Sequence, residues 1–123
     1  MATTIEQDVH AALSGHAGLA ALVGDRIYPV VLPEGVSYPA VRYQRIGGGP
    51  VQHTGGDSGL ENVRVQIDVW ARRYAQAKDA AEQVRAAMRA ATGFKAVSVA
   101  EVDGYEDDTR TFRVTLDYSL WRQ

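Results

Sequence analysis

Residues 60–71 have the sequence LENVRVQIDVWA, and residues 72–93 follow at once as RRYAQAKDAAEQVRAAMRAATG. In the first stretch apolar and polar side chains alternate with period two, which is typical of a β-strand with one buried face. In the second stretch apolar residues recur every three or four positions from Tyr74 to Ala91, the spacing of a helix with one apolar stripe. A half-polar strand followed by such a helix predicts a sheet that helices cover on one face only.

Two further strands are predicted after this helix, over residues 96–105 and 110–121, with a polar turn between them. The second of them alternates throughout, with Val114 and Leu116 on one face and Arg113 and Asp117 on the other. This pattern repeats that of residues 60–71, so both strands are expected to present their polar side chains on the same face of one sheet.

Toward the N-terminus, residues 39–46 predict a strand that begins at Pro39, and residues 26–32 form a shorter extended piece. Helical spacing precedes them. It begins near Thr3, where Thr3 and Glu6 fit a capping box, and Gly15 divides it into one broken helix or two short ones. The predicted order is α-β-β-β-α-β-β. It indicates an α+β fold, with a mostly antiparallel sheet and two helices packed on one face.

The chain has 123 residues, without an internal repeat or a linker, and is expected to form a single domain over residues 1–123. Residues 47–59 hold six of the 12 glycines and predict a glycine-rich flexible loop, either a hairpin loop or an arm. A phosphate-binding loop is the alternative. It would need a Gly-Lys-Ser/Thr end that leads into a helix, and here the glycines lead into a strand.

Composition excludes several classes of protein. The net charge of −2 argues against a dedicated nucleic-acid binder, and the absence of cysteine excludes disulfides and thiolate chemistry. No apolar run approaches the roughly 18 residues of a membrane helix, and the N-terminal residues do not have the pattern of a signal peptide. Eleven of the 13 basic residues are arginine, which suits protein interfaces or reflects a GC-rich genome.

Signals for catalysis or for a cofactor are weak. His10, His16 and His53 lack the spacing of metal ligands, and the acidic residues at 103–108 lack the spacing of a calcium loop. Nothing resembles a nucleophile elbow. The sequence therefore predicts no enzyme, no cofactor and no metal. A small α+β enzyme or ligand-binding domain without a recognised active site is the alternative.

Both tryptophans are predicted to lie on the polar face of the sheet. Trp70 is in register with Arg64, and Trp121 is in register with Arg113. Trp and Arg are enriched among the residues that dominate protein interfaces, so this face is expected to meet another protein. The alternative is that a bulge or a strand end turns each tryptophan back to the core. The interface candidates are Trp70, Trp121, Arg64, Arg113, His53 and Asp57.

Four stretches resemble the tail-completion proteins of phages with long non-contractile tails and of gene transfer agents. They are Leu19–Pro29, Tyr38–Arg45, Val65–Ala71 and the C-terminal segment from Tyr105 through Trp121. Members of this family are tail terminators or head–tail joining proteins. The resemblance implies a virion protein, assembled in the host cytoplasm, that forms a hexameric ring. The ring would cap the head-proximal end of the tail tube, with the tube protein and a head-completion or stopper protein as partners.

DNA passes through such a ring without specific binding, so a negative lumen would keep it mobile. We therefore expect four acidic residues to face the channel: Asp103, Glu106, Asp107 and Asp108. An ordinary solvated turn on the outer rim is the alternative.

Overall fold

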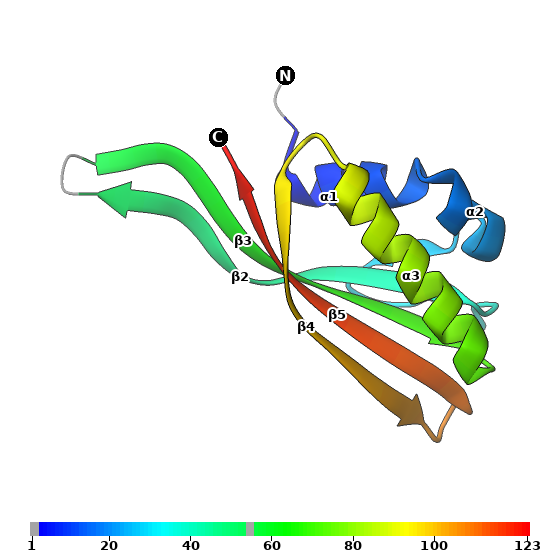
Figure 1. Ribbon diagram of the computed structural model, residues 1–123. Coiled ribbons are helices and arrows are strands. Elements are labelled where there is room, and N and C mark those ends of the chain that lie inside the picture. Colours follow the sequence, from blue (N-terminus) through cyan, green and yellow to red (C-terminus); the bar gives the residue numbers. More distant parts are fainter. Residues whose placement is uncertain (1–2, 54–55) are drawn as a thin grey trace.

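The computed structural model describes residues 3–53 and 56–123, and at residues 52, 53 and 56–58 it describes the backbone alone. Within these residues a sheet lies beside three helices (Figure 1). The elements are α1 (Ile5–Ser14), α2 (Ala17–Val23), β1 (Ile27–Pro29), β2 (Ala40–His53), β3 (Gly56–Ala71), α3 (Tyr74–Ala90), β4 (Lys95–Glu106) and β5 (Thr111–Arg122).

The strands form one sheet in the order β1-β2-β3-β5-β4. Only β1 and β2 run parallel in the described sheet, and every other neighbouring pair is antiparallel. The predicted α+β fold, with its mostly antiparallel sheet and helices on one face, is therefore confirmed.

The first helix begins one residue later than predicted. Thr4, not Thr3, is the N-cap: its hydroxyl accepts a hydrogen bond from the Gln7 N–H at 3.1 Å, and its N–H donates to Gln7 Oε1 at 2.8 Å. Gln can take the place of Glu in a capping box, so the sequence contains two overlapping capping boxes, Thr3 with Glu6 and Thr4 with Gln7. Gly15 ends α1, and α2 follows as a separate short helix.

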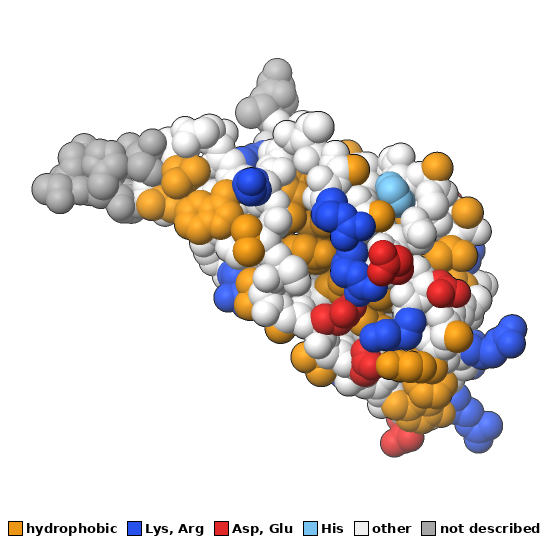
Figure 2. All heavy atoms as spheres, in the orientation of Figure 1, with side chains coloured by type: hydrophobic (Ala, Val, Ile, Leu, Met, Phe, Trp, Pro, Cys, Tyr) orange, Lys and Arg blue, Asp and Glu red, His pale blue; other side chains and the backbone are white. Residues whose placement is uncertain are grey.

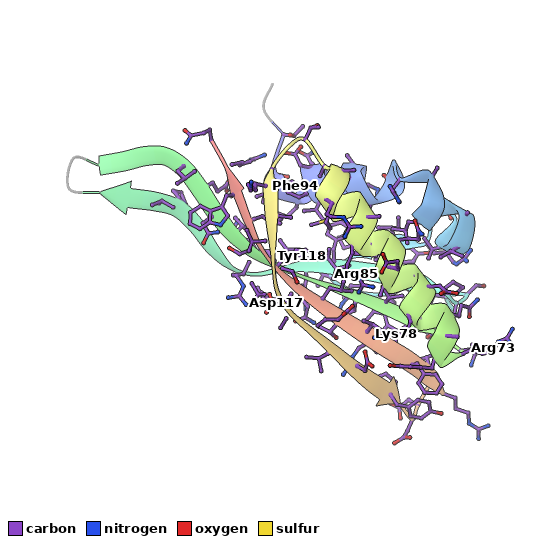
Figure 3. All side chains as sticks on the ribbon, in the orientation of Figure 1. Arg73, Lys78, Arg85, Phe94, Asp117 and Tyr118 are labelled. Atoms are coloured by element: carbon purple, nitrogen blue, oxygen red, sulfur yellow. The ribbon has the colours of Figure 1, made fainter. Side chains whose placement is uncertain are left out.

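The core lies between the helices and the sheet. Small buried residues such as Ala77 and Ala81 let α3 lie close to the sheet, and they belong to the same core cluster as Val65 and Ile67 of β3. Figure 3 shows Tyr118 and Asp117 on opposite sides of β5, with Tyr118 on the helix side. One face of β3 and of β5 is therefore buried, whereas the outer strand β4 has no buried residue. The other face of the sheet, which we call the open face, carries the polar side chains.

Strands β2 and β3 continue beyond the rest of the sheet as a curved hairpin (Figure 1). The last pair between β3 and β5 is Glu61 with Arg122, and we call the hairpin beyond it, residues 51–53 and 56–60, the arm. The stretch predicted as a loop is therefore mostly paired strand, with residues 54 and 55 outside the described part. Its glycines allow the strands to bend. Gly48 and Gly59 have positive φ, and β2 contains two register shifts. The mobility of this stretch stays a prediction.

Candidate assembly surface

The centre of the open face is a network around a buried carboxylate. Asp68 has no exposed surface, and its oxygens accept hydrogen bonds from the Arg42 guanidinium, from Gln66 Nε2 at 2.9 Å and from Thr115 Oγ1 at 2.5 Å. These residues come from three neighbouring strands, because β3 lies between β2 and β5. The network connects the three strands in the middle of the sheet, and neither Arg42 nor Asp68 is among the predicted interface residues.

Two of the predicted interface arginines are bound within the same face. Arg64 donates to both oxygens of Asp117, at 3.2 and 2.5 Å, and this pairing raises the pKa of Arg64. Arg113 pairs with Glu106. Each pair keeps a half-exposed arginine in a fixed position. The arginine side chain therefore has less conformational entropy to lose when a partner binds it.

Trp70 lies on the open face, as predicted, but it is only 9% exposed. Neither a bulge nor a strand end has turned it into the helix-side core. The Arg42 guanidinium lies 5.1 Å from its ring centroid, and the β1–β2 connection passes beside it. Trp70, the β1–β2 connection, Arg72 and the β4–β5 turn line a cavity of about 720 Å³. Trp70 therefore lies on the predicted face but is nearly buried there, and its role in an interface stays a prediction.

Trp121 is 38% exposed and pairs with Lys95 and Asn62 at the end of the sheet from which the arm extends. Hydrophobic side chains gather where the arm leaves the body (Figure 2). His53 and Asp57 belong to the arm through backbone pairing with Gly56 and Gln52, and their side chains lie outside the described part. The arm and Trp121 therefore form one end of the candidate surface.

The four acidic candidates do not share one face. Asp103 lies on the helix side of β4, where the Tyr74 hydroxyl donates to it at 2.5 Å and Lys78 pairs with it at 3.2 Å. Both contacts lower the pKa of Asp103, and the hydrogen bond from the Tyr74 hydroxyl has the larger effect. Glu106 lies on the open side with Arg113, and the exposed Asp107 and Asp108 form the turn after it. Only part of this group can therefore line any one surface.

The sequence patterns also did not predict that the outer strand β4 exposes apolar side chains. Its Val97, Val99 and Val102 are exposed, although they belong to a regular strand at the edge of the sheet. A register shift between Ser98 and Ala100 breaks the alternation. The run of spaced valines in an otherwise polar strand was the signal available in the sequence.

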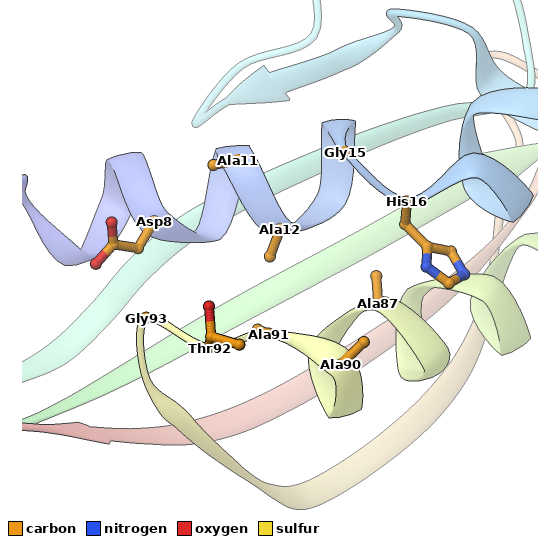
Figure 4. Close-up of a pocket in the computed structure, with 10 residues that line it drawn as sticks. All are labelled: Asp8, Ala11, Ala12, Gly15, His16, Ala87, Ala90, Ala91, Thr92 and Gly93. Carbon is orange, nitrogen blue, oxygen red and sulfur yellow. The ribbon is translucent and has the colours of Figure 1, made fainter.

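The groove between α1 and the end of α3 does not have the character of a ligand site (Figure 4). It has a volume of about 380 Å³, and five of its ten lining residues are alanines. Its two titratable groups are already bound: Asp8 pairs with Arg122 at 2.6 Å, and His16 contacts Gln83 at 3.1 Å. The described residues contain no group of three potential metal ligands, and none of their helices is long and apolar enough to cross a membrane.

Comparison with known proteins matches these features to one family. A chain in the structure "Virion of native gene transfer agent (GTA) particle" has the same fold, with a TM-score of 0.74, 22% identity, and coverage of 92% of this chain and 90% of that chain. No curated protein matches at a significant level. The family described as tail completion protein gp17 matches residues 7–123. The match covers nearly the whole sequence, including every described strand of the sheet, so the chain belongs to the tail completion protein gp17 family.

Proposed function

We propose that this protein forms a ring, a hexamer, that caps the head-proximal end of a tail tube. The cap stops tube polymerisation and joins the tail to the head connector. The family match over residues 7–123 carries the proposal, because it makes the chain a structural protein of the virion tail. The role requires binding and shape complementarity, and it requires no catalysis.

The open face and the sheet edges support this role. A ring needs a heterologous contact, in which one patch of a subunit meets a different patch of the next. The sheet offers two different edges, β4 on one side and β2 beyond β1 on the other. It also offers an open face on which Arg64 and Arg113 are held in place by carboxylates.

The arm and Trp121 are the proposed contact with the tube or with a neighbouring subunit. They lie at the same end of the sheet, and the arm projects beyond the body (Figure 1). An exposed tryptophan supplies a large apolar anchor, and a two-stranded arm adds reach. His53 and Asp57 are proposed to act in the same contact.

Tube growth in the presence of the purified protein tests the capping function. Tube subunits polymerised alone should give long tubes of variable length, and the added protein should stop growth and appear as a ring at one tube end in electron micrographs. Tubes that grow to the same length and show no terminal density would refute capping. Capped tubes that fail to attach to filled heads would separate capping from joining.

A shortened-arm variant tests the contact assigned to the arm. Replacing residues 51–60 by a two-residue turn should leave folding intact, because the deleted pairs lie beyond the last pair of β3 with β5. The same variant should lose tube capping. Full capping activity in the variant would assign the contact elsewhere.

A further inference from the structure

The root of the arm, residues 48–50 and 61–63, is where β2 and β3 leave the rest of the sheet. Beyond the pair of Glu61 with Arg122, the described part of β3 has no further pair with β5, and β2 and β3 pair only with each other. A two-stranded hairpin on its own is only marginally stable. The direction of the arm relative to the body of the subunit therefore depends on the contacts made at the root.

Arg122 joins three segments of the chain at this root. Its Nε donates to Glu61 Oε1 at 2.8 Å, its Nη1 donates to Asp8 Oδ2 at 2.6 Å, and its Nη2 donates to the Thr3 carbonyl at 3.0 Å. The side chains of Arg122, Asp8 and Glu61 are 22%, 19% and 26% exposed, so salt and water screen these pairs only in part. Because the guanidinium is planar and rigid, three such bonds fix its orientation. Arg122 therefore connects the root, through Glu61, with the first turn of α1, through Asp8.

The carboxylate of Asp8 is itself held in place (Figure 4). Thr3 Oγ1 donates to Asp8 Oδ1 at 2.5 Å, and Oδ2 accepts from Arg122. A Cβ at Gly93, in the connection from α3 to β4, would lie 3.1 Å from both Cγ and Oδ2 of Asp8, which is tighter than an ordinary van der Waals contact. Glycine at this position therefore leaves the space in which Asp8 meets Arg122.

Arg45 makes a similar connection on the other strand of the root. Its Nη2 donates to the Gly48 carbonyl at 2.6 Å, and its Nη1 donates to Glu6 Oε1 at 3.4 Å. Glu6 belongs to the first turn of α1, as Asp8 does. The pair of Arg45 with Glu6 is longer and more exposed than the pairs of Arg122, so we expect it to contribute less. Both strands of the root are thus bound to the same turn of α1.

A cleft of about 510 Å³ lies beside the root. Its lining includes Pro50 and Glu61 from the root, and Thr3, Gly93 and Arg122 from the body. Side chains do not fill this side of the root, so packing alone does not determine how the root lies against the body. The hydrogen bonds of Arg122 determine it instead.

We propose that Arg122 is a positioning residue for tube capping: it holds the root against the first turn of α1 and thereby sets the direction of the arm. This inference rests on the proposed function, in which the arm contacts the tube or a neighbouring subunit. Arg122 acts through the arm, because an arm with a fixed direction loses less entropy when it binds.

Two spin labels measure the direction of the arm. One is attached at Gln52→Cys on the arm and the other at Ala75→Cys on α3, because the chain has no cysteine of its own. In the otherwise unchanged subunit, the distance between the labels should have one narrow distribution. Arg122→Gln should broaden this distribution, because Gln keeps a polar side chain but lacks the guanidinium.

Arg85→Gln is the matched control. Arg85 also pairs with two carboxylates, those of Glu82 and Glu101, and its side chain is 29% exposed, close to the value for Arg122. It connects α3 with β4 and makes no bond to the root. The distance distribution in Arg85→Gln should therefore equal that of the parent.

Asp8→Asn separates positioning from a general effect on stability, and it also provides the test if Arg122→Gln does not fold. It removes the partner of Arg122 on α1 and leaves β3 and β5 unchanged. Asp8→Asn should also broaden the distribution, and the variant with both substitutions should resemble Arg122→Gln alone, because both changes remove the same contact. Independent, additive effects of the two substitutions would overturn the inference.

Tube capping gives the functional readout. Arg122→Gln should need about tenfold more protein than the parent to stop tube growth, because an arm without a fixed direction must be ordered on binding. Arg85→Gln should cap as the parent does. The inference is overturned if Arg122→Gln leaves the distance distribution unchanged, or if it broadens the distribution and caps tubes normally. Failure of the parent itself to cap tubes would refute the proposed function, whereas an unchanged distribution in Arg122→Gln refutes this inference alone.

Discussion

The guanidinium of Arg42 and the carboxylate of Asp68 pair across β2 and β3 on the sheet face opposite the three described helices. Asp68 is fully buried although this face is open, because Thr115, Gln66 and Arg42 surround it. Arg42 in turn stacks over Trp70. A fixed polar network therefore organises this surface before any partner binds, which is the preorganisation that an assembly contact requires.

Asp68→Ala should lower the free energy of unfolding by about 2–3 kcal/mol, because it leaves Arg42 without its buried partner. Chemical denaturation measures the change. Asp117→Ala is the matched control: it breaks the more exposed pair with Arg64 and should cost less than about 1 kcal/mol. Equal losses in the two variants would show that burial does not set the strength of these pairs.

Trp70→Ala should destabilise the isolated subunit by about 3 kcal/mol, since it removes a large, nearly buried side chain. Trp121→Ala should change stability little, because Trp121 is much more exposed. In tube-capping assays we expect the reverse order of severity among variants that remain folded. A Trp121→Ala protein that caps tubes normally would remove Trp121 from the proposed contact.

Gly48→Ala should disrupt the pairing between β2 and β3 just before the arm. Gly48 has a φ of 91°, and a Cβ there would lie 2.3 Å from the Asn62 carbonyl oxygen and 2.7 Å from Val63 Cα. Both atoms are backbone, so the strands must separate. Gly47→Ala is the control, because a Cβ at Gly47 meets nothing within 4 Å. Hydrogen exchange of the arm amides should accelerate in the first variant only.

The order of elements could be predicted from the sequence because burial on one face imposes a simple period. Residues 63–69 and 112–120 alternate, and Tyr74–Ala90 forms a helix as its spacing predicts. An arm was one of the two predictions for residues 47–59, but its strands were not predicted, because glycine propensity favours a loop and only pairing between β2 and β3 makes residues 47–53 a strand.

The burial of Trp70 depended on contacts distant in sequence. Register correctly assigned Trp70 to the open face, but the β1–β2 connection that passes beside it comes from residues 32–38. The split of the acidic group, by contrast, follows from strand alternation, because Asp103 and Glu106 are three residues apart on β4 and fall on opposite faces. Local patterns assign faces, and tertiary contacts decide exposure.

Asp103 should contribute to stability at neutral pH and lose that contribution in acid. Its pKa in the folded protein is lowered by the Tyr74 hydroxyl and by Lys78. A lowered pKa means that the contribution is complete above the unfolded value of about 4 and disappears as the pH falls through the folded value. Asp103→Asn should therefore be less stable than the parent at pH 7, and this difference should shrink at low pH. A difference independent of pH would exclude the charged contacts as its cause.

Asp107 and Asp108 are the acidic candidates best placed to face a channel, because both are exposed in the β4–β5 turn, whereas Asp103 and Glu106 are tied to Lys78 and Arg113. The variant with Asp107→Lys and Asp108→Lys should assemble tails of normal number and length but eject DNA more slowly. Lysines in a channel bind passing phosphates, and added salt should restore the rate by screening that attraction. Asp25→Lys with Asp79→Lys is the matched control, since it changes the net charge equally at exposed positions outside this turn. Equal ejection rates in the two variants would place the turn on the outside of the ring.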